Sequence, residues 1–280
     1  MEYSVSIKPI DVNGESLVEI HQYLKNVFPD NAKFTFDFVK WQYTQNPLGT
    51  MKGFNALVDN QIVSHFAALP INMNLFGQER KGLLCINVST YPEYRGQKLF
   101  SKVGQSTVEY AKNNGYDFLI AVPNANSTHA FLKYFDFYLI STLTVKVGFG
   151  KNIYPDKKFN GYKTWDSKQL EWRLNNPTNK YYSCDNDIIS TPISFFAKTL
   201  SKLQAGNADN KETVLNNHAF FRPVNLYVGL GADTSKGFYF NIPSFIKRPP
   251  FNLVFKDLTG EIPTIKKEDV FIQLIDLDTI

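Results

Sequence analysis

Apolar and polar positions follow a readable order along the first half of the chain. Residues 3–10 alternate with a period of two, as a half-buried strand does, whereas apolar residues in 14–28 recur at helical spacing. The same reasoning predicts a helix over 34–43, then the stretch 54–60 with a turn at Asp59-Asn60, and strands over 61–76 and 80–91. It also predicts a helix over 97–114, a strand over 117–123, a helix over 126–135 and a closing strand over 137–147. Alternating helices and strands predict an α/β fold.

The pattern weakens after Gly150, but one feature of the first half returns. Residues 150–165 are polar and rich in turn formers, which indicates a connection. Strand-like runs follow at 225–231, 237–243, 251–258 and 270–280. A predicted helix that carries Trp and stops at Asn-Pro occurs twice, as Trp41 to Pro47 and as Trp172 to Pro177. Chance could produce this echo, but it favours two related units in tandem, over 1–150 and 151–280, each a mixed twisted sheet flanked by helices.

Composition narrows the class of protein only a little. An apolar content of 43% is that of a globular protein with a core, and a net charge of +4 is spread without a basic arm. Two cysteines form no disulfide framework, and Cys85, in an apolar run, is expected to be buried. The first residues lack the basic start and apolar core of a signal peptide, and no apolar run is long enough to span a bilayer. We therefore expect a cytoplasmic protein.

Candidate chemistry begins in the stretch TYPEYRGQKLFSKV, residues 90–103, where a predicted strand meets a predicted helix. The free N–H groups of a helix start attract an anion, and Gly96 lets a ligand approach the main chain closely. Arg95, Lys98 and Lys102 add positive charge suited to phosphate oxygens. The stretch lacks the GxxxxGK[ST] spacing of a mononucleotide P-loop.

This stretch resembles the pyrophosphate loop of the GCN5-related N-acetyltransferase (GNAT) superfamily, whose pattern is Arg/Gln-x-x-Gly-x-Gly/Ala. The match is partial, because Lys98 and Phe100 replace the two small residues. The segment PNANSTHAFLKYFDF, from Pro123, resembles the Asn-x-x-Ser helix of the same family, with Asn124 and Ser127 matching. The resemblance covers about residues 3–148.

The resemblance implies acyl-CoA as co-substrate, without a metal, and it implies roles for particular residues. Val88 would offer its backbone N–H to the thioester, with Ser89 and Thr90 beside the pantetheine. The residues expected to bind CoA are Val88, Ser89, Thr90, Arg95, Gly96, Gln97, Lys98, Leu99, Phe100, Ser101, Asn124 and Ser127. A thioester is already reactive, so the protein must mainly orient the reactants and stabilise the oxyanion.

Proton removal from the attacking amine needs a base, and the sequence offers few. His65, on a strand expected beside the CoA strand, is our candidate, with a structural histidine as the alternative; His129 is less favoured. The tyrosine acid common in the family would fall on Phe131 or Leu132 here, so the acid role has no residue. Phe38, Trp41 and Tyr43 form an aromatic stripe that either packs in the core or forms a wall of the acceptor pocket.

These features predict an acyl-CoA-dependent N-acyltransferase acting on the amine of a nucleotide-linked amino sugar, as in surface polysaccharide biosynthesis. The second unit would contribute to acceptor binding without a pyrophosphate loop. The alternatives are an aminoacyl transferase to a cell-wall precursor and a non-catalytic acyl-CoA-binding protein. We expect no nucleic-acid partner, and the sequence leaves homo-oligomer formation, the acyl length and the identity of the sugar open.

Overall fold

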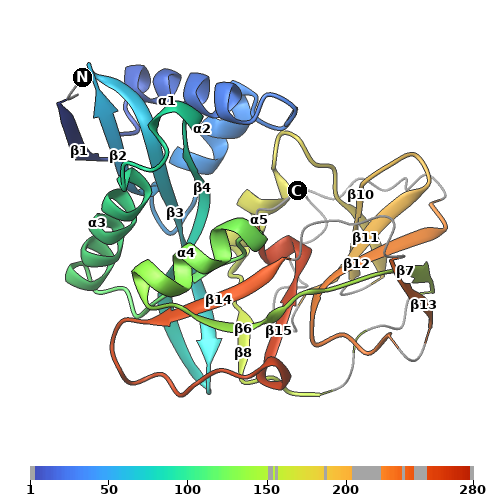
Figure 1. The fold of residues 1–280 in the computed structure, drawn as a ribbon. Coiled ribbons are helices and arrows are strands. Elements are labelled where there is room, and N and C mark those ends of the chain that lie inside the picture. The colour runs from blue at the N-terminus through green and yellow to red at the C-terminus, as the bar shows by residue number, and fades with distance from the viewer. Residues whose placement is uncertain are drawn as a thin grey trace. The chain divides into compact units, whose positions relative to one another are not determined.

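The computed structural model describes residues 4–150, 154, 157–185, 188–203, 222–234, 237–242 and 251–277, and it is drawn in Figure 1. Contacts divide the chain into two compact units. The first unit comprises Met1–Ile71, Arg80–Leu139 and Val254–Glu261, and the second comprises Asn72–Glu79, Ile140–Leu253 and Ile262–Ile280. The units are therefore not two consecutive segments such as 1–150 and 151–280.

The first unit is a mixed sheet with helices. Its elements are β1 (Val5–Pro9), α1 (Gly14–Val27), α2 (Phe36–Thr44), β2 (Lys52–Val58), β3 (Gln61–Leu75), β4 (Gln78–Thr90), η1 (Pro92–Tyr94), α3 (Leu99–Asn113), β5 (Phe118–Ala121), α4 (Ala125–Phe135) and β14 (Asn252–Asp257). The strand order is β1-β2-β3-β4-β5-β14. β4 and β5 are parallel, with α3 as their crossover, whereas β14 runs antiparallel to β5.

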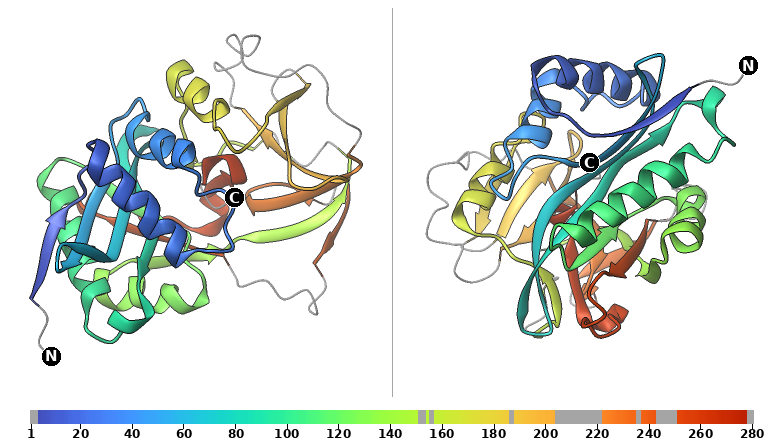
Figure 2. Two further views of the ribbon diagram at one scale, coloured as in Figure 1. Left: turned by 90° about the horizontal axis from the view of Figure 1, so that it is seen from above. Right: turned by 90° about the vertical axis from the view of Figure 1, so that its left-hand side faces the viewer.

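The helices of the first unit cover both faces of its sheet (Figure 2). Phe66 of β3 points to the α3–α4 face, where its ring meets those of Phe100, Phe131 and Phe135. The preceding residue, His65, points to the opposite face and packs against Tyr23 of α1 and Tyr43 of α2. Because side chains alternate along a strand, β3 supplies a core to each face. Its run of buried residues follows from this double covering.

Local sequence explains where these helices begin. The side chain of Asn13 accepts the backbone N–H of Ser16 at the start of α1, and Thr35 does the same for Phe38 at the start of α2. α3 is different, because Lys98 at its N-cap has a φ of 60° and no side chain caps the helix. The helix predicted from Gln97 therefore begins two residues later, at Leu99, since a left-handed residue cannot continue a right-handed helix.

The second unit consists mainly of strands in its described residues. Its elements are β6 (Tyr138–Thr142), β7 (Thr144–Phe149), β8 (Gly161–Lys163), α5 (Ser167–Leu174), β9 (Tyr182–Asp185), β10 (Ile188–Pro192), β11 (Ala197–Lys202), β12 (Val224–Leu230), β13 (Phe238–Asn241), η4 (Lys267–Asp269), β15 (Val270–Gln273) and η5 (Leu274–Asp276). β9, β10 and β11 form an antiparallel meander, and β11 then pairs in parallel with β12.

The order of elements in the second unit repeats that of the first. A helix with a buried Trp precedes three antiparallel strands, and the third strand has a parallel neighbour: α2 to β5 in one unit, α5 to β12 in the other. The two Asn-Pro stops are alike, because Asn46 accepts the N–H of Leu48 and Asn176 accepts that of Thr178. The predicted α/β class is confirmed, and this common order supports the predicted tandem relationship.

Each parallel pair takes its antiparallel neighbour from a distant part of the sequence. β5 of the first unit pairs with β14, and β12 of the second unit pairs with β7. The closing strand predicted over 137–147 is accordingly two strands, β6 and β7, separated at Leu143, whose N–H donates to the carbonyl of Phe251. The strand predicted over 251–258 exists, but it completes the first sheet.

Candidate active site

The site begins where β4 and β5 of the first unit separate. Their parallel register pairs Gly82–Cys85 with Phe118–Ala121, and β5 ends there while β4 continues to Thr90. The backbone of β4 from Ile86 onward is thus not used by β5. Cys85, at the last pair, is buried as predicted, and burial raises the pKa of its thiol. A strand edge of this kind offers backbone N–H and C=O groups to a ligand.

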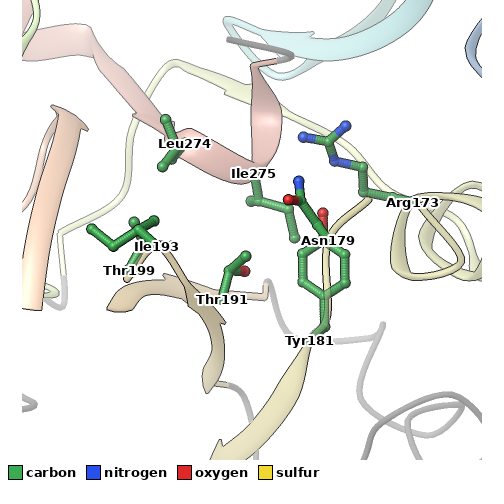
Figure 3. A pocket seen from close by; sticks show the side chains of 8 residues that line it. All are labelled: Arg173, Asn179, Tyr181, Thr191, Ile193, Thr199, Leu274 and Ile275. Carbon is green, nitrogen blue, oxygen red and sulfur yellow. The ribbon is translucent and has the colours of Figure 1, made fainter. Parts of the chain in front are cut away.

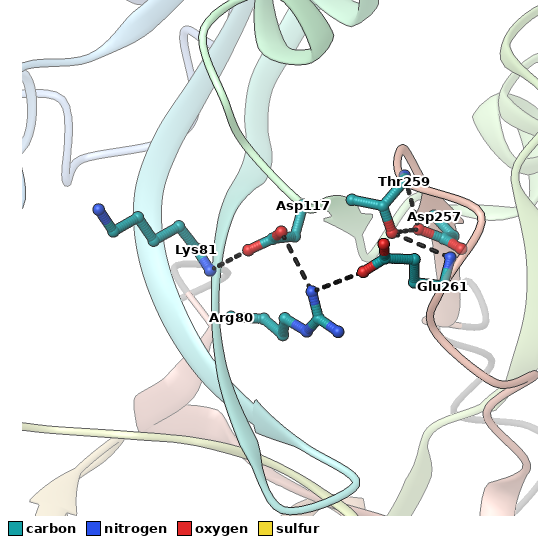
Figure 4. A network of polar contacts seen from close by, with 6 residues as sticks. All are labelled: Arg80, Lys81, Asp117, Asp257, Thr259 and Glu261. Atoms are coloured by element: carbon teal, nitrogen blue, oxygen red, sulfur yellow. Dashed lines mark hydrogen bonds and ion pairs between the residues drawn. The ribbon is translucent and has the colours of Figure 1, made fainter.

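At the other end of the β4–β5 pair, backbone and side-chain contacts hold the two strands together (Figure 4). The backbone N–H of Lys81 donates to Asp117 Oδ2 at 2.9 Å, and the N–H of Asp117 donates to the Lys81 carbonyl at 2.7 Å. Arg80 Nη1 lies 3.5 Å from Asp117 Oδ1 and 3.4 Å from Glu261 Oε2. These contacts hold the start of the pair closed, so the strands part only beyond Cys85.

Asn87 interrupts the extended conformation of β4 just past the last pair. Its φ is +52°, a left-handed conformation that asparagine tolerates better than most residues. The three residues that follow, Val88, Ser89 and Thr90, are half-buried. Val88 packs against the α3–α4 core, whereas Ser89 Oγ donates to Tyr23 Oη of α1 at 3.1 Å. The predicted thioester and pantetheine residues therefore lie on the part of β4 that has left β5.

The predicted phosphate-binding turn leads from this strand into α3. Gly96 has a φ of +79°, and a Cβ placed on it would meet no atom within 4 Å, so the space over the turn is open. The uncapped start of α3 adds free N–H groups and the positive end of the helix dipole. Arg95, Gln97 and Lys98 are exposed, and Arg95 Nε donates to the Thr90 carbonyl at 3.3 Å.

The first residues of α3 contribute to this turn in different ways. Leu99 is buried in the α3–α4 core. The ring of Phe100 lies 6.1 Å from that of Phe66 and 5.3 Å from that of Phe135. Their side chains therefore pack, and they can reach an anion only through backbone N–H groups. Ser101, half-buried in the first turn, completes this group.

Asn124 and Ser127 come together at the start of α4. Asn124 Oδ1 accepts the backbone N–H of Ser127 and its hydroxyl, each at 3.0 Å. This is an N-cap, so the matched pair has a structural use whether or not it binds CoA. Downstream on the same helix, Phe131 is buried among aromatic rings and cannot donate a proton, and Tyr134 is 44% exposed.

The structure gives His65 an environment unlike that of a general base. The side chain is fully buried; Nε2 lies 2.8 Å from Tyr43 Oη, and Nδ1 lies 2.6 Å from Asn55 Oδ1. Burial lowers the pKa of the imidazole to about 3, so the ring is neutral at physiological pH and a weak proton acceptor. Both nitrogens are already occupied, and this arrangement favours the structural alternative.

The aromatic stripe of α2 is buried as well. Phe38 and Tyr43 have no exposed surface, and Trp41 is 3% exposed. Phe38 packs between Phe34 and Trp41, with ring centroids 6.1 Å and 5.5 Å apart. A pocket wall needs an exposed ring face, so the acceptor-wall interpretation has no support in this arrangement, and core packing accounts for all three residues.

Sequence reasoning missed the polar groups that flank β4. Ser64 of β3 bonds the Ser89 carbonyl at 3.2 Å and the Thr90 hydroxyl at 2.8 Å. Asn87 donates to Gln42 Oε1 of α2 at 2.7 Å. The available signal was the alternation of Asn87 and Ser89 with apolar neighbours, which indicates a polar stripe on one face of the strand.

A polar hollow of about 320 Å³ was also missed. Its lining, all from the first unit, is Glu19, Gln22, Tyr23, Asn26, Asn60, Gln61, Ile62 and Tyr91. Tyr23 is the residue that accepts the bond from Ser89, and burial raises its pKa. The hollow therefore adjoins the face of β4 that carries Ser89. Among the described residues, no three His, Cys, Asp or Glu side chains group as metal ligands do.

In the second unit, a side chain of the protein itself occupies the place where the corresponding parallel strands, β11 and β12, separate. β11 and β12 pair only over Ala197–Thr199 and Val224–Leu226. Beyond this, the side chain of Gln273 bonds both backbone groups of Lys202, at 2.7 Å to N–H and 2.9 Å to C=O. The neighbouring pocket in Figure 3, lined by Arg173 and Thr199 among others, has a volume of about 20 Å³. Such a space accommodates one water.

Comparison with known proteins finds a family model that is similar to part of the chain. Residues 9–140 match the family model described as an acetyltransferase (GNAT) domain. No curated protein matches the chain. Among the part of the chain that the structure describes, no helix is both long and apolar enough to cross a bilayer.

Solved structures share the fold over most of the chain. A probable N-acyltransferase from Enterococcus faecalis has a TM-score of 0.63 at 12% identity, covering 92% of this chain and 74% of its own. Eis1 from Mycobacterium abscessus has a TM-score of 0.57 at 8% identity, covering 92% and 74%. A GCN5-related glucosamine N-acetyltransferase region of a fungal multi-domain protein has a TM-score of 0.51 at 9% identity, covering 91% and 38%.

These likenesses extend through both units, whereas the family match ends at residue 140. At these identities the solved structures establish the fold alone. The family match falls on the segment that contains the open end of β4, the turn at Gly96 and α4. Over residues 9–140, somewhat less than half of the chain, the protein is therefore similar to GNAT acetyltransferase domains.

Proposed function

We propose that the protein transfers an acyl group from acyl-CoA to the amine of an amino sugar, with a nucleotide-linked amino sugar as the preferred acceptor. The observation that carries the acyl-CoA part is the free end of β4 leading into an uncapped helix start. Thioester and pantetheine would lie along Val88–Thr90, and the pyrophosphate would lie on the turn of Arg95 and Gly96. An uncapped N-terminus with nearby cations is a good phosphate site.

The chemistry asked of the protein is modest. The amine nitrogen attacks the thioester carbon, the oxyanion that forms accepts the Val88 N–H, and the C–S bond then breaks to release CoA thiolate. The proton lost by the amine passes to solvent, because His65 is buried and neutral. A sugar amine with a lowered pKa is partly neutral near pH 7 and needs no strong base.

The polar hollow beside Tyr23 supports the acceptor class. Its volume of about 320 Å³ is at the lower end of small-molecule sites. Glu19 offers a carboxylate to an ammonium group, and Gln22, Asn26, Asn60 and Gln61 offer amides to hydroxyls. Such a lining suits a polyhydroxylated amine, and one fold neighbour carries the name glucosamine N-acetyltransferase.

Binding and turnover test this function directly. Calorimetry should show CoA binding that weakens with salt and is lost in Gly96→Glu, which adds bulk and negative charge at the phosphates. Gly77→Glu is the matched control, because Gly77 also has a positive φ, of 85°, and open space around it. Equal CoA affinity in the two variants would refute the placement of the phosphates.

Thiol release from acetyl-CoA, measured with free glucosamine, nucleotide-linked amino sugars, polyamines and amino acids, then tests the acceptor. We expect release with the sugar amines. CoA binding without release for any amine would favour the non-catalytic alternative. Release with polyamines or amino acids alone would refute the sugar acceptor.

A further inference from the structure

We infer that a buried chain of hydrogen bonds, from Asn55 through His65 and Tyr43 to Asn87, positions the turn in β4 that aims the Val88 N–H at the thioester. This inference rests on the proposed function, because it assigns a task to residues around that site. None of the four is a catalytic residue, since each acts through the backbone of β4. The chain belongs wholly to the first unit.

The distances, and the rules for which groups can donate, fix the donor in each hydrogen bond of this series. Asn55 Oδ1 can only accept, so His65 Nδ1 carries the proton of the 2.6 Å bond between them. His65 Nε2 therefore has a lone pair and accepts the Tyr43 hydroxyl at 2.8 Å. Tyr43 Oη in turn accepts from Asn87 Nδ2 at 3.1 Å, and the second hydrogen of Nδ2 goes to Gln42 Oε1 at 2.7 Å.

Burial makes these bonds hard to replace. His65, Tyr43 and Gln42 have no exposed surface, and Asn55 is 7% exposed. Water cannot substitute for a lost partner there, so each group would remain unsatisfied if the chain were broken. The chain therefore connects rigid elements, β2, β3 and α2, to a single half-buried side chain on β4.

Asn87 is the residue of β4 whose conformation these hydrogen bonds hold in place. Its φ of +52° lies between the last residue paired with β5, Cys85, and the proposed donor, Val88. A non-glycine residue in this conformation is strained and persists only where its surroundings hold it. The peptide that follows Asn87 carries the Val88 N–H, so rotation at Asn87 would turn that N–H away. Two hydrogen bonds to α2 hold the Asn87 amide and oppose this rotation.

The neutrality of His65 suits this role. Only the neutral ring can accept the Tyr43 hydroxyl, and burial keeps the pKa at about 3. The groups that face the ring from the packed elements are Tyr23 of α1, Tyr43 of α2 and Asn55 of β2, and none of them carries a charge at neutral pH. The pH profile of turnover should therefore show no step from His65, unlike that of an enzyme with a histidine base.

The direct readout is the carbonyl of bound acetyl-CoA. With the carbonyl carbon labelled with carbon-13, the infrared stretch of the wild-type complex should lie below that of free acetyl-CoA, because an N–H donated to the oxygen weakens the C=O bond. Tyr43→Phe, which removes the hydroxyl between His65 and Asn87, should move the band toward the free position. Tyr227→Phe, a buried tyrosine of the second unit whose hydroxyl accepts the Ala232 N–H, is the control and should leave the band in place.

Kinetics give the second readout, with the amine that supports thiol release. Tyr43→Phe should lower kcat by about 10- to 100-fold, less than the about 10²–10³ expected for complete loss of an oxyanion donor, with a nearly unchanged KM for acetyl-CoA. Asn87→Gly, which keeps the freedom to adopt a positive φ but removes the amide, should behave alike, and it tests the idea even if Tyr43→Phe does not fold.

The outcomes separate this inference from the proposed function. A wild-type protein that binds no acetyl-CoA would refute the proposed function, and this inference with it. A wild-type band at the free position, or an unchanged band and kcat in folded Asn87→Gly, would refute the positioning role while leaving acyl-CoA binding intact. A loss of thermal stability in Tyr43→Phe with the band unchanged would make the chain structural only.

Discussion

Replacing His65 by glutamine should change how the stability of the first unit depends on pH. In the unfolded chain the imidazole has its ordinary pKa of about 6.5, whereas in the folded protein burial lowers it to about 3. Below pH 6.5 the unfolded state therefore binds a proton that the folded state refuses. The stability associated with the neutral ring is fully present above the unfolded pKa and is lost as the pH falls toward the folded pKa.

The size of the effect follows from the two pKa values. The free energy of unfolding should fall by about 1.4 kcal/mol for each pH unit below 6.5, and by about 5 kcal/mol in total at pH 3. Glutamine can donate to Asn55 and accept from Tyr43 as the neutral ring does, but it has no proton to gain. His65→Gln should therefore show a shallower decline in acid than the wild type, whatever its stability at pH 7.

The assay is urea unfolding followed by tryptophan fluorescence at pH 7, 6, 5 and 4, in wild type, His65→Gln and His129→Gln. His129 is exposed on α4 and serves as the surface control for replacing a histidine by glutamine. Between pH 6 and pH 5, the unfolding free energy of the wild type should fall by about 1 kcal/mol or more relative to that of His65→Gln. Parallel curves for these two proteins would show that His65 takes up its proton equally well in the folded and unfolded states, contrary to this account.

Two further substitutions test the hollow and the second unit. Glu19→Gln should raise the KM for the amine about three- to tenfold without changing the KM for acetyl-CoA, because it removes the carboxylate offered to an ammonium group. Glu15→Gln, outside the hollow on the same helix, is the control. Equal effects of the two substitutions would contradict the acceptor placement. Gln273→Ala should lower the unfolding free energy by about 1–3 kcal/mol, because it removes the amide that bonds the backbone N–H and C=O of Lys202. The control, Gln105→Ala, lies exposed on α3 and should change the unfolding free energy by less than about 0.5 kcal/mol. A similarly small effect of Gln273→Ala would show that water replaces the amide.

Local pattern was sufficient for most elements of the first unit, because their periodicity and caps lie in adjacent residues. The helix predicted over 14–28 is α1, Gly14–Val27, and that predicted over 126–135 is α4, Ala125–Phe135. The origin of β14 could not be predicted in this way. Its pairing with β5 joins Val254 to Ala121, and no nearby residue encodes such a distant choice.

The site shows the same division between local and distant information. The turn at Gly96 was predictable, because glycine, cations and a helix start are neighbours in sequence. The role of His65 was not, because it depends on Tyr43 and Asn55, which approach only when α2 packs on the sheet. A histidine on a strand carries no sign of whether its ring faces a ligand or a core. The α2 aromatic residues were ambiguous for the same reason.

The two parallel strand pairs show how one arrangement gives either a cleft or a packed interior. In each unit the pair stops early, at Cys85 and Ala121 in the first and at Thr199 and Leu226 in the second. A buried backbone N–H or C=O must find a partner, so the separated ends have to be filled by a ligand, by water or by protein. In the second unit Gln273 supplies both bonds to Lys202. In the first unit the side chains that reach the free part of β4 bond Asn87, Ser89 and Thr90 from the flanking elements. The edge of β4 beyond the end of β5 keeps its backbone groups for a ligand. A thioester and its pantetheine can complete the hydrogen bonding of β4 along this edge.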